Sequence, residues 1–364
     1  MQRAIQLTAP GAPFVLGTRP IPRPKSGELL VKILTTAINP CDLYMQARGY
    51  PGPIPKPWPN VCGWDAAGVV EEIGEGVQGF VKGDRVMYSG DFDDDRYTFQ
   101  EYGITVAATT AKISSGLSLE EAATFSTGLY TAASGLYGER ATEHRRWHGG
   151  AGLVAPWDGG GRGMYKDEPI IITGGAGSVG QFAIQLAKLS GFNPIITTAS
   201  AHNEAYCKSA GATHVIDYRT TPYSSLSSVV SSILLDTFGD AHKPIKTIFD
   251  TVSIAETNIA CWSILASGGT LIITLPPSKE IGNYGLGAEK NQDGKSNDTL
   301  GDVRLGERLF GALDKMISEE DLMPNRLEVL EGGLSAIEGA ARRMEGGGVS
   351  GLKLVVRVPD TPSL

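Results

Sequence analysis

The sequence predicts an α/β protein with two domains, one built from antiparallel β-strands in a barrel-like arrangement and one doubly wound around a parallel sheet. The chain has 364 residues, about twice the usual domain length of roughly 100–200 residues, so two hydrophobic cores are expected. Up to residue 110 the chain alternates short β-like runs with turn signals, whereas residues 169–275 alternate strand-like and helix-like segments. The first pattern favours antiparallel strands and the second favours βα units on a parallel sheet.

The barrel-like domain is expected to take residues 1–130 and to be completed by residues 304–364. Its candidate strands are Glu28 to Leu34, Ala67 to Ile73, Arg85 to Tyr88 and Tyr102 to Val106. After Arg304 the pattern predicts a helix, a short β segment, a second helix and the closing strand LKLVVRV. We expect these last elements to return to the first domain.

The doubly wound domain is expected at residues 131–303 and is preceded by a helix. Ser118 and Glu121 have the spacing of a capping box in front of an apolar run, so a helix should begin there. Residues 139–168 mix charge with many glycines and lack periodicity, which predicts an exposed insertion. Its His144 and His148 have i,i+4 spacing, but no third ligand lies nearby, and we expect two solvated loop residues.

Charge and composition exclude several classes of protein. The net charge is −8 and no run of lysine or arginine exceeds two residues, so the sequence does not predict binding to nucleic acid. No apolar run approaches the roughly 20 residues that a membrane helix needs, and the start MQRAIQLTAPGAP resembles neither a signal nor a transit peptide. We expect a cytoplasmic protein that acts on small molecules, with four scattered cysteines as free thiols.

A glycine-rich turn predicts a dinucleotide site at the start of the parallel sheet. After the strand PIIIT, the turn TGGAGSVG leads into an amphipathic helix, and Gly175, Gly177 and Gly180 have G-x-G-x-x-G spacing. In a Rossmann fold the first glycine permits the tight turn, the second lets the pyrophosphate approach, and the third packs helix on strand. Ala176, Ser178 and Val179 complete the expected pyrophosphate segment.

The end of the second strand favours NADPH over NADH. An NAD site places Asp or Glu about 20 residues after the glycine turn, but here Ser200, His202 and Asn203 are neutral donors. Tyr218 and Arg219 follow the next strand, where we expect them on the adenine ribose side, with Arg219 offering a cation to the 2′-phosphate. The alternative is that Ser200 and Asn203 cap the next helix.

Four segments resemble the medium-chain dehydrogenase/reductase superfamily: INPCDLYMQARGYPG, NVCGWDAAGVVEEIGEGVQGFVKGDRV, TGGAGSVGQFAIQLAKLSG and EGGLSAIEGAARRMEGGGVSGLKLVVRV. The resemblance implies a GroES-like catalytic domain and a Rossmann cofactor domain. Within the superfamily, SAHN after the second strand and the closing segment resemble the zinc-free fungal trans-acting enoyl reductases of the lovastatin type. Quinone oxidoreductases are similar as well. The resemblance therefore implies secondary metabolism and a polyketide synthase as partner.

The same resemblance predicts a site without metal. Zinc alcohol dehydrogenases of the superfamily use a Cys three residues before an Asp, the His of a G-H-E and a later Cys. Asn39 and Trp64 stand at the first two places, and no cysteine lies between Cys62 and Cys207. Asp65 stands where the family has Glu, and we expect a turn or packing carboxylate there.

The candidate catalytic residues also come from the resemblance. Tyr50 falls at the tyrosine of mitochondrial enoyl reductases, and Tyr44 at that of quinone reductases. A phenol can donate a hydrogen bond to a developing enolate, and the alternative is that either tyrosine only lines the pocket. Thr131 matches a position near the nicotinamide, with a buried helical threonine as the simpler alternative. Pro40 and Leu275 are further candidates for contact with the cofactor.

Together these features predict an NADPH-dependent reductase of α,β-unsaturated carbonyl compounds, free or bound to a carrier protein. One alternative is a zinc-free quinone or alkenal reductase that acts on free small molecules. A second is a protein that binds NADPH without turnover.

Overall fold

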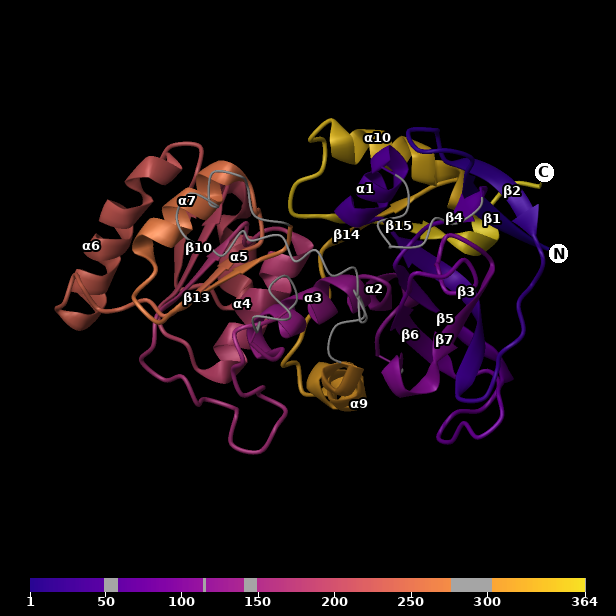
Figure 1. Cartoon of the computed structure of the whole chain (residues 1–364), viewed down its shortest axis with the longest axis horizontal. Helices are drawn as coiled ribbons and strands as arrows, with labels where there is room; N and C mark the ends of the chain where they lie inside the picture. The colour runs from indigo at the N-terminus through magenta and orange to yellow at the C-terminus, as the bar shows by residue number, and fades with distance from the viewer. Residues whose placement is uncertain (49–57, 114–115, 141–148, 276–302, 364) are drawn as a thin grey trace, which may run out of the picture. The chain divides into compact units, whose positions relative to one another are not determined.

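A computed structural model describes residues 1–48, 58–113, 116–140, 149–275 and 303–363 (Figure 1). The chain divides into two compact units. Met1–Thr127, Gly306–Glu320 and Pro324–Leu364 form the first, and Gly128–Leu305 with Asp321–Met323 form the second. The sequence placed the boundaries at residues 130 and 304. Among the described residues, no helix is long and apolar enough to cross a membrane.

The first unit consists mainly of two β-sheets. Its strands are β1 (Gln2–Leu7), β2 (Val15–Arg19), β3 (Glu28–Ala37), β4 (Asn60–Val61), β5 (Asp65–Ile73), β6 (Arg85–Ser89), β7 (Tyr102–Val106), β8 (Thr110–Lys112), β14 (Leu327–Leu330) and β15 (Lys353–Arg357). One sheet has the order β2-β1-β4, and the other has the order β14-β15-β3-β5-β6-β8, with β7 paired to β3. All pairs are antiparallel except β14 with β15.

The C-terminal strand completes the first unit, as the sequence predicts. β15 pairs with β3, and Val355 lies opposite Ala37. Leu29, Val31 and Ile33 alternate along β3 and are at most 1% exposed, because side chains two residues apart share one face of a strand. Leu354 and Val356 of β15 pack into the same core cluster.

Several helices belong to the first unit or to the segments of chain that lead into and out of it. They are α1 (Pro40–Arg48), α2 (Leu119–Ala122), α3 (Ser126–Tyr137), α9 (Val303–Ser318) and α10 (Ile337–Glu345), with 3₁₀ turns η1 (Ala107–Thr109), η4 (Gly333–Ala336) and η5 (Val358–Asp360). The capping box of Ser118 and Glu121 is present and begins α2, which confirms the predicted helix start. The helix is interrupted after Ala122, and α3 begins at Ser126.

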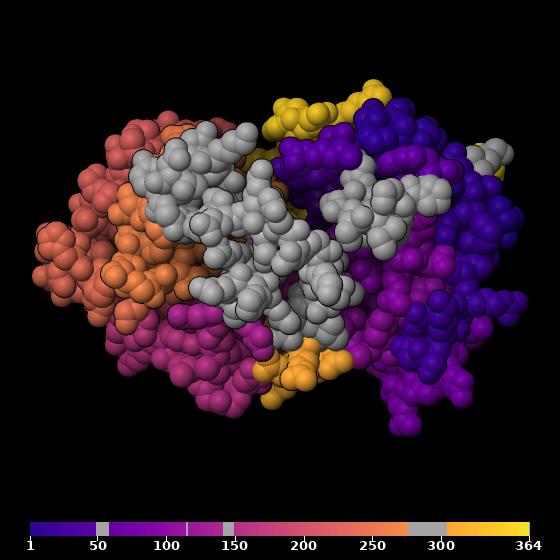
Figure 2. All heavy atoms as spheres, in the orientation of Figure 1, coloured from indigo at the N-terminus to yellow at the C-terminus, as the bar shows by residue number. Residues whose placement is uncertain are grey.

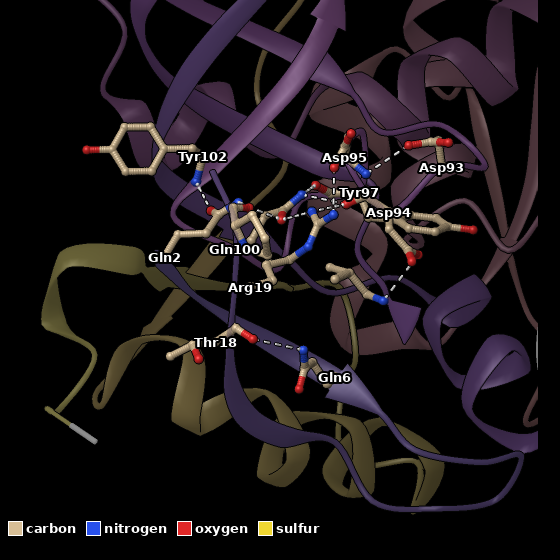
Figure 3. A network of polar contacts seen from close by, with 12 residues as sticks. Gln2, Gln6, Thr18, Arg19, Asp93, Asp94, Asp95, Tyr97, Gln100 and Tyr102 are labelled. Atoms are coloured by element: carbon tan, nitrogen blue, oxygen red, sulfur yellow. Dashed lines mark hydrogen bonds and ion pairs between the residues drawn. The ribbon is translucent and has the colours of Figure 1, made fainter. Parts of the chain in front are cut away.

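A polar network fastens the small sheet to residues 91–100 (Figure 3). Arg19 of β2 donates to the Asp94 carbonyl at 2.6 Å, to Asp95 Oδ1 at 2.6 Å and to Gln100 Oε1 at 2.7 Å. Gln2 of β1 donates to the same Gln100 oxygen at 3.2 Å. The network satisfies buried amides at the edge of the barrel, and we assign it a structural role.

The second unit is a five-stranded parallel sheet with helices on both faces (Figure 1). The strands are β9 (Ile170–Thr173), β10 (Ile195–Ala199), β11 (His214–Asp217), β12 (Thr247–Asp250) and β13 (Thr270–Ile273), in the order β11-β10-β9-β12-β13. The helices are α4 (Ser178–Ser190), α5 (Glu204–Ala210), α6 (Leu226–Phe238) and α7 (Ala255–Ile264), with 3₁₀ turns η2 (Ala201–Asn203) and η3 (Tyr223–Ser225). This arrangement confirms the predicted doubly wound fold.

One helix of this unit was not predicted from the sequence. The prediction of alternating strands and helices over residues 169–275 did not single out a helix between the last two strands, where α7 lies. Parallel strands need a crossover connection, usually helical, so β12 and β13 require such an element. α6 and α7 share one apolar cluster with β9, β10, β11 and β12.

The described part of the expected insertion, residues 149–168, differs from the exposed loop that the sequence predicts. Ala151 and Ala155 are each 1% exposed. The backbone amides of Ala151, Gly163 and Tyr165 donate to carbonyls at the ends of α3 and α4 at 2.8–2.9 Å. The segment therefore covers these helix ends with its own backbone. His144 and His148 lie outside the described residues.

Candidate functional site

The glycine turn between β9 and α4 has one residue in the left-handed region, and it is not the one that the sequence pattern indicates. Gly174 has φ +63°, so the tight turn falls one residue before the G-x-G-x-x-G begins. Gly175 is required for a different reason. A Cβ there would lie 2.2 Å from Thr197 Oγ1 on the neighbouring strand β10.

The other two glycines of the motif have different surroundings. A Cβ on Gly180 would lie 2.2 Å from the Gly174 carbonyl oxygen, so close packing of α4 on the turn requires glycine there. Gly177 has φ −72° and ψ 163°, which any residue adopts. Among the described residues, a Cβ there would meet only the Gly174 oxygen, at 3.3 Å. Neither the backbone nor the packing of the described residues requires a glycine at position 177.

The space at Gly177 fits the phosphates of a dinucleotide. Gly177 is the N-cap residue of α4 and no side chain caps this helix. The first amides of a helix lack partners within the helix, and its positive dipole end favours an anion. A Cβ at position 177 would fill the approach to these amides, so the residues present fit a pyrophosphate. Ala176, Ser178 and Val179 flank it and are half-buried.

The ends of β10 and β11 bring the predicted ribose contacts together. Ala199 and Asp217 are in register, so Ser200 and Tyr218 are neighbours. Ser200 Oγ donates to the Tyr218 hydroxyl at 3.0 Å. Tyr218 is 41% exposed and lies parallel to the ring of Tyr223, with centroids 6.5 Å apart.

The alternative that Ser200 and Asn203 act as helix caps is wrong. Ser200 precedes η2 and Asn203 precedes α5, and neither side chain makes a cap hydrogen bond. Asn203 is 4% exposed and its Nδ2 lies 3.2 Å from Nε2 of the exposed His202. Arg219 is exposed, and its guanidinium has no ion-pair partner among the described residues.

Thr131 and Leu275 belong to the same unit. α3 lies against the first turn of α4, since a Cβ on Gly128 would be 2.3 Å from Ser178 Oγ. Thr131 is three residues further along α3 and so shares the side of Gly128. It is half-buried. Leu275 follows Thr274 after the end of β13, and Thr274 N donates to Ser253 Oγ at 2.8 Å.

A buried ion pair of the first unit lies beside Asn39, which stands at the place of a zinc ligand in the zinc alcohol dehydrogenases. Lys353 Nζ lies 2.8 Å from Asp65 Oδ2 and 2.5 Å from Asn39 Oδ1. Asn39 Nδ2 donates to the same Asp65 oxygen at 2.8 Å. The Lys353 and Asp65 side chains are 4% and 0% exposed. Asp65 is thus an ion-paired carboxylate, whereas a turn or packing residue was expected.

Asp65 and Asp42 also organise two helix starts. Asp65 Oδ1 accepts from Thr127 N at 2.7 Å in the first turn of α3. Asp42 Oδ2 accepts from Asn39 N at 2.8 Å at the start of α1. Burial, together with the charge of the nearby Asp65, raises the pKa of Asp42 to about 8, although the Asn39 amide and the Lys353 ammonium act to lower it.

The remaining predicted residues of this unit lie on or beside α1. Pro40 is the first residue of the helix and is exposed. Tyr44 is 40% exposed, and the Arg48 guanidinium lies 5.6 Å from the centre of its ring. Tyr50 lies outside the described residues. Trp64 packs edge-on against Phe92 and Tyr97, which suits a ring in the barrel core.

The described residues contain no cluster of three or more His, Cys, Asp or Glu that would hold a metal ion.

The pair of Asp65 and Lys353 was not predicted from the sequence. The two residues come from opposite ends of the chain, and no local spacing signals their contact. The one signal in the sequence was that Asp65 stands where the family has Glu, because a carboxylate kept at such a position can have a charged partner.

Comparisons with known proteins agree with this architecture. Residues 25–131 match the family model of the alcohol dehydrogenase GroES-like domain, and residues 178–280 match that of the zinc-binding dehydrogenases. A trans-enoyl reductase of Aspergillus sclerotiorum is 29% identical and covers 98% of this chain and 100% of its own. A trans-enoyl reductase of Cochliobolus carbonum is 33% identical over 74% of this chain and 81% of its own. A quinone oxidoreductase from Coxiella burnetii is 25% identical with a TM-score of 0.71, and covers 98% of this chain and 99% of its own.

Proposed function

The chain belongs to the medium-chain dehydrogenase/reductase superfamily of oxidoreductases, and we propose that it reduces α,β-unsaturated carbonyl compounds with NADPH. The observation that carries the proposal is the open position at Gly177. A glycine that neither the backbone nor the packing needs, at the uncapped start of α4, suits the close approach of a pyrophosphate. NADPH bound there supplies a hydride to the β-carbon of the substrate.

The choice of NADPH rests on the ends of β10 and β11. Ser200 and Tyr218 present hydroxyls there, and the exposed Arg219 adds a cation. A carboxylate at the Ser200 position would repel a 2′-phosphate, and none is present. His202 is exposed beside them. These groups support recognition of a phosphorylated ribose.

The proposed catalytic residues stabilise the enolate that hydride addition leaves on the substrate. We assign Tyr50 as the donor of a hydrogen bond to the enolate oxygen, with Tyr44 and Thr131 as further candidates. Loss of such a donor typically costs about 2.7–4 kcal/mol. Tyr50→Phe should therefore lower kcat and kcat/KM together, by roughly a hundredfold to a thousandfold, with NADPH affinity unchanged.

Tyr44→Phe is the matched control for Tyr50→Phe, because each change removes one phenol hydroxyl from this part of the chain. We expect it to reduce turnover less. A Tyr50→Phe enzyme that keeps more than about a third of its turnover, an effect under roughly 0.7 kcal/mol, would reassign Tyr50 to the shape of the pocket. Water would then be the simpler proton source.

For the substrate, we propose an enoyl chain carried by a polyketide synthase, which makes the protein a trans-acting enoyl reductase. Two fungal relatives that align over most of this chain bear that name. The second candidate is reduction of free quinones or alkenals, which the similarity to a quinone oxidoreductase favours. The proposed cellular site is the cytoplasm.

One assay separates these functions. NADPH oxidation is followed with a pantetheine-linked enoyl thioester, a free enone and a quinone, before and after dialysis against a strong chelator. Preference for the thioester supports the enoyl reductase, and preference for the quinone supports the second candidate. NADPH binding without oxidation of any of the three would indicate a non-catalytic protein. We expect turnover to survive the chelator, because Asn39 and Trp64 cannot replace thiolate and imidazole as zinc ligands.

A further inference from the structure

Asp250, the last residue of β12, has a fully buried carboxylate that accepts five hydrogen bonds, and its side chain is 0% exposed. Oδ1 accepts from Thr173 Oγ1 at 2.5 Å, Ser253 N at 2.9 Å and Val252 N at 3.2 Å. Oδ2 accepts from Asn258 Nδ2 at 2.5 Å and Thr257 Oγ1 at 2.6 Å.

No basic side chain among the described residues forms an ion pair with Asp250. Burial of an unpaired carboxylate costs folding free energy, and the five donors offset that cost. An ionised carboxylate is the one side-chain group with only acceptor sites, roughly four lone pairs on two oxygens. A carboxylate at this position can therefore accept hydrogen bonds from several segments at once, whereas an amide or a hydroxyl has fewer acceptor sites.

The first segment that Asp250 holds is the glycine turn. Thr173, which donates to Asp250, directly precedes Gly174. Thr251 Oγ1 in turn donates to the Thr173 carbonyl at 2.7 Å. A Cβ on Gly174 would lie 2.8 Å from Val252 Cγ2. Residues 251–253 thus lie against the turn that begins the pyrophosphate site.

The second segment is the end of β13. Ser253 is in the left-handed region with φ +54°, and its amide is bound to Asp250. Its Oγ donates to the Asp250 carbonyl at 2.6 Å and accepts from Thr274 N at 2.8 Å. Leu275, a predicted cofactor contact, comes next in the chain. Asp250 therefore fixes the carboxyl ends of β9, β12 and β13 relative to one another.

In a doubly wound sheet a dinucleotide lies across the point where the strand order reverses, with one half over each half of the sheet. Here that point lies between β9 and β12. The Ser200 and Tyr218 groups mark the adenosine half over β10 and β11, which leaves the ends of β12 and β13 for the other half. We propose that Asp250 is a positioning residue for the nicotinamide half of the cofactor site. This inference rests on the proposed NADPH function.

The test is Asp250→Asn, which keeps the size of the side chain and one acceptor oxygen but removes the charge. Asn258 Oδ1 has no hydrogen-bond partner among the described residues, so the Asn258 amide can rotate and accept from the new amide. Binding of NADPH and of 2′,5′-ADP, which carries only the adenosine half, is measured by calorimetry. We expect NADPH to bind at least tenfold more weakly and 2′,5′-ADP to change less than twofold.

Asp236→Asn is the matched control, because it removes one charge from the same unit. Asp236 is exposed on α6, which lies on the surface of the second unit (Figure 2). We expect it to leave the binding of both probes unchanged.

Selective loss of NADPH binding supports the proposal, because a general loosening of the unit would weaken both probes. Equal weakening of both, or no weakening of either, overturns it. If Asp250→Asn does not fold, Ser253→Ala is the second variant, because it keeps the Asp250 carboxylate and removes the hydrogen bond from Thr274 N. We expect it to weaken NADPH binding at least threefold and to leave 2′,5′-ADP binding unchanged. A wild-type protein that binds neither probe overturns the proposed cofactor and this inference with it.

Discussion

The Gly177→Ala variant tests whether the glycine at this position is needed for cofactor binding or for the fold. The backbone at Gly177, with φ −72° and ψ 163°, accepts alanine. Within 4 Å the new Cβ would have one neighbour among the described residues, the Gly174 oxygen at 3.3 Å. Alanine is a poorer N-cap residue than glycine by up to about 1 kcal/mol. Alanine also lowers the conformational entropy of the unfolded chain, which stabilises the folded state by about 0.4–1 kcal/mol. The free energy of unfolding should therefore change by less than about 1 kcal/mol.

NADPH binding should respond much more strongly to Gly177→Ala. A methyl group at the start of α4 blocks the approach of a phosphate oxygen to the first amides of the helix. Loss of one hydrogen bond to a charged group costs about 1.5–3 kcal/mol, so the dissociation constant should rise roughly tenfold to 150-fold. Fluorescence titration with NADPH measures this change, and urea unfolding measures stability.

Gly180→Ala is the comparison within the same motif. Its Cβ would lie 2.2 Å from the Gly174 oxygen and 2.9 Å from two further backbone atoms, and a backbone cannot move aside as a flexible side chain does. We expect this variant to lose about 1–3 kcal/mol of stability. The reasoning fails if Gly177→Ala binds NADPH within threefold of the wild type, or if it is destabilised as much as Gly180→Ala.

Three further predictions concern charge. Wild-type protein should bind NADPH at least tenfold more tightly than NADH, about 1.4 kcal/mol, and Ser200→Asp should reverse that preference in the same titration; equal affinities in the wild type would contradict the role of Ser200. Lys353→Met should lower the free energy of unfolding by about 3–5 kcal/mol, because it leaves the buried Asp65 charge without its partner, and adding Asp65→Asn should restore part of it; a loss under about 1 kcal/mol would show that the pair is dispensable. Burial raises the pKa of Asp42 to about 8, from about 3.9 in an unfolded chain, so the folded state holds this proton more tightly and stability falls as pH rises from about 4 to about 8. Asp42→Asn should flatten that fall in urea unfolding measured across the range, and an unchanged pH profile would assign the fall to other groups.

The features that the sequence predicts correctly are those set by near neighbours in the chain. The capping box joins Ser118 and Glu121, three residues apart, and the structure forms it at the predicted place. The period of hydrophobic residues likewise predicts both kinds of sheet, because the faces of a strand or helix depend on local spacing. α7 was not predicted, although two parallel strands require such a connection.

The sequence by itself determined the two sheet types, the return of the last strand and the place of the glycine turn. Only the tertiary structure showed which glycine of that turn the fold does not require. Gly175 and Gly180 are fixed by Thr197 and by the Gly174 carbonyl, at 2.2 Å from a Cβ in each case, whereas a Cβ on Gly177 would meet only the Gly174 oxygen among the described residues, at 3.3 Å. The hydrogen-bond and ion-pair partners of Asp65 and Asp250 could not be predicted from the sequence either. A buried carboxylate must find its donors wherever the fold brings them, and Lys353 reaches Asp65 from the far end of the chain.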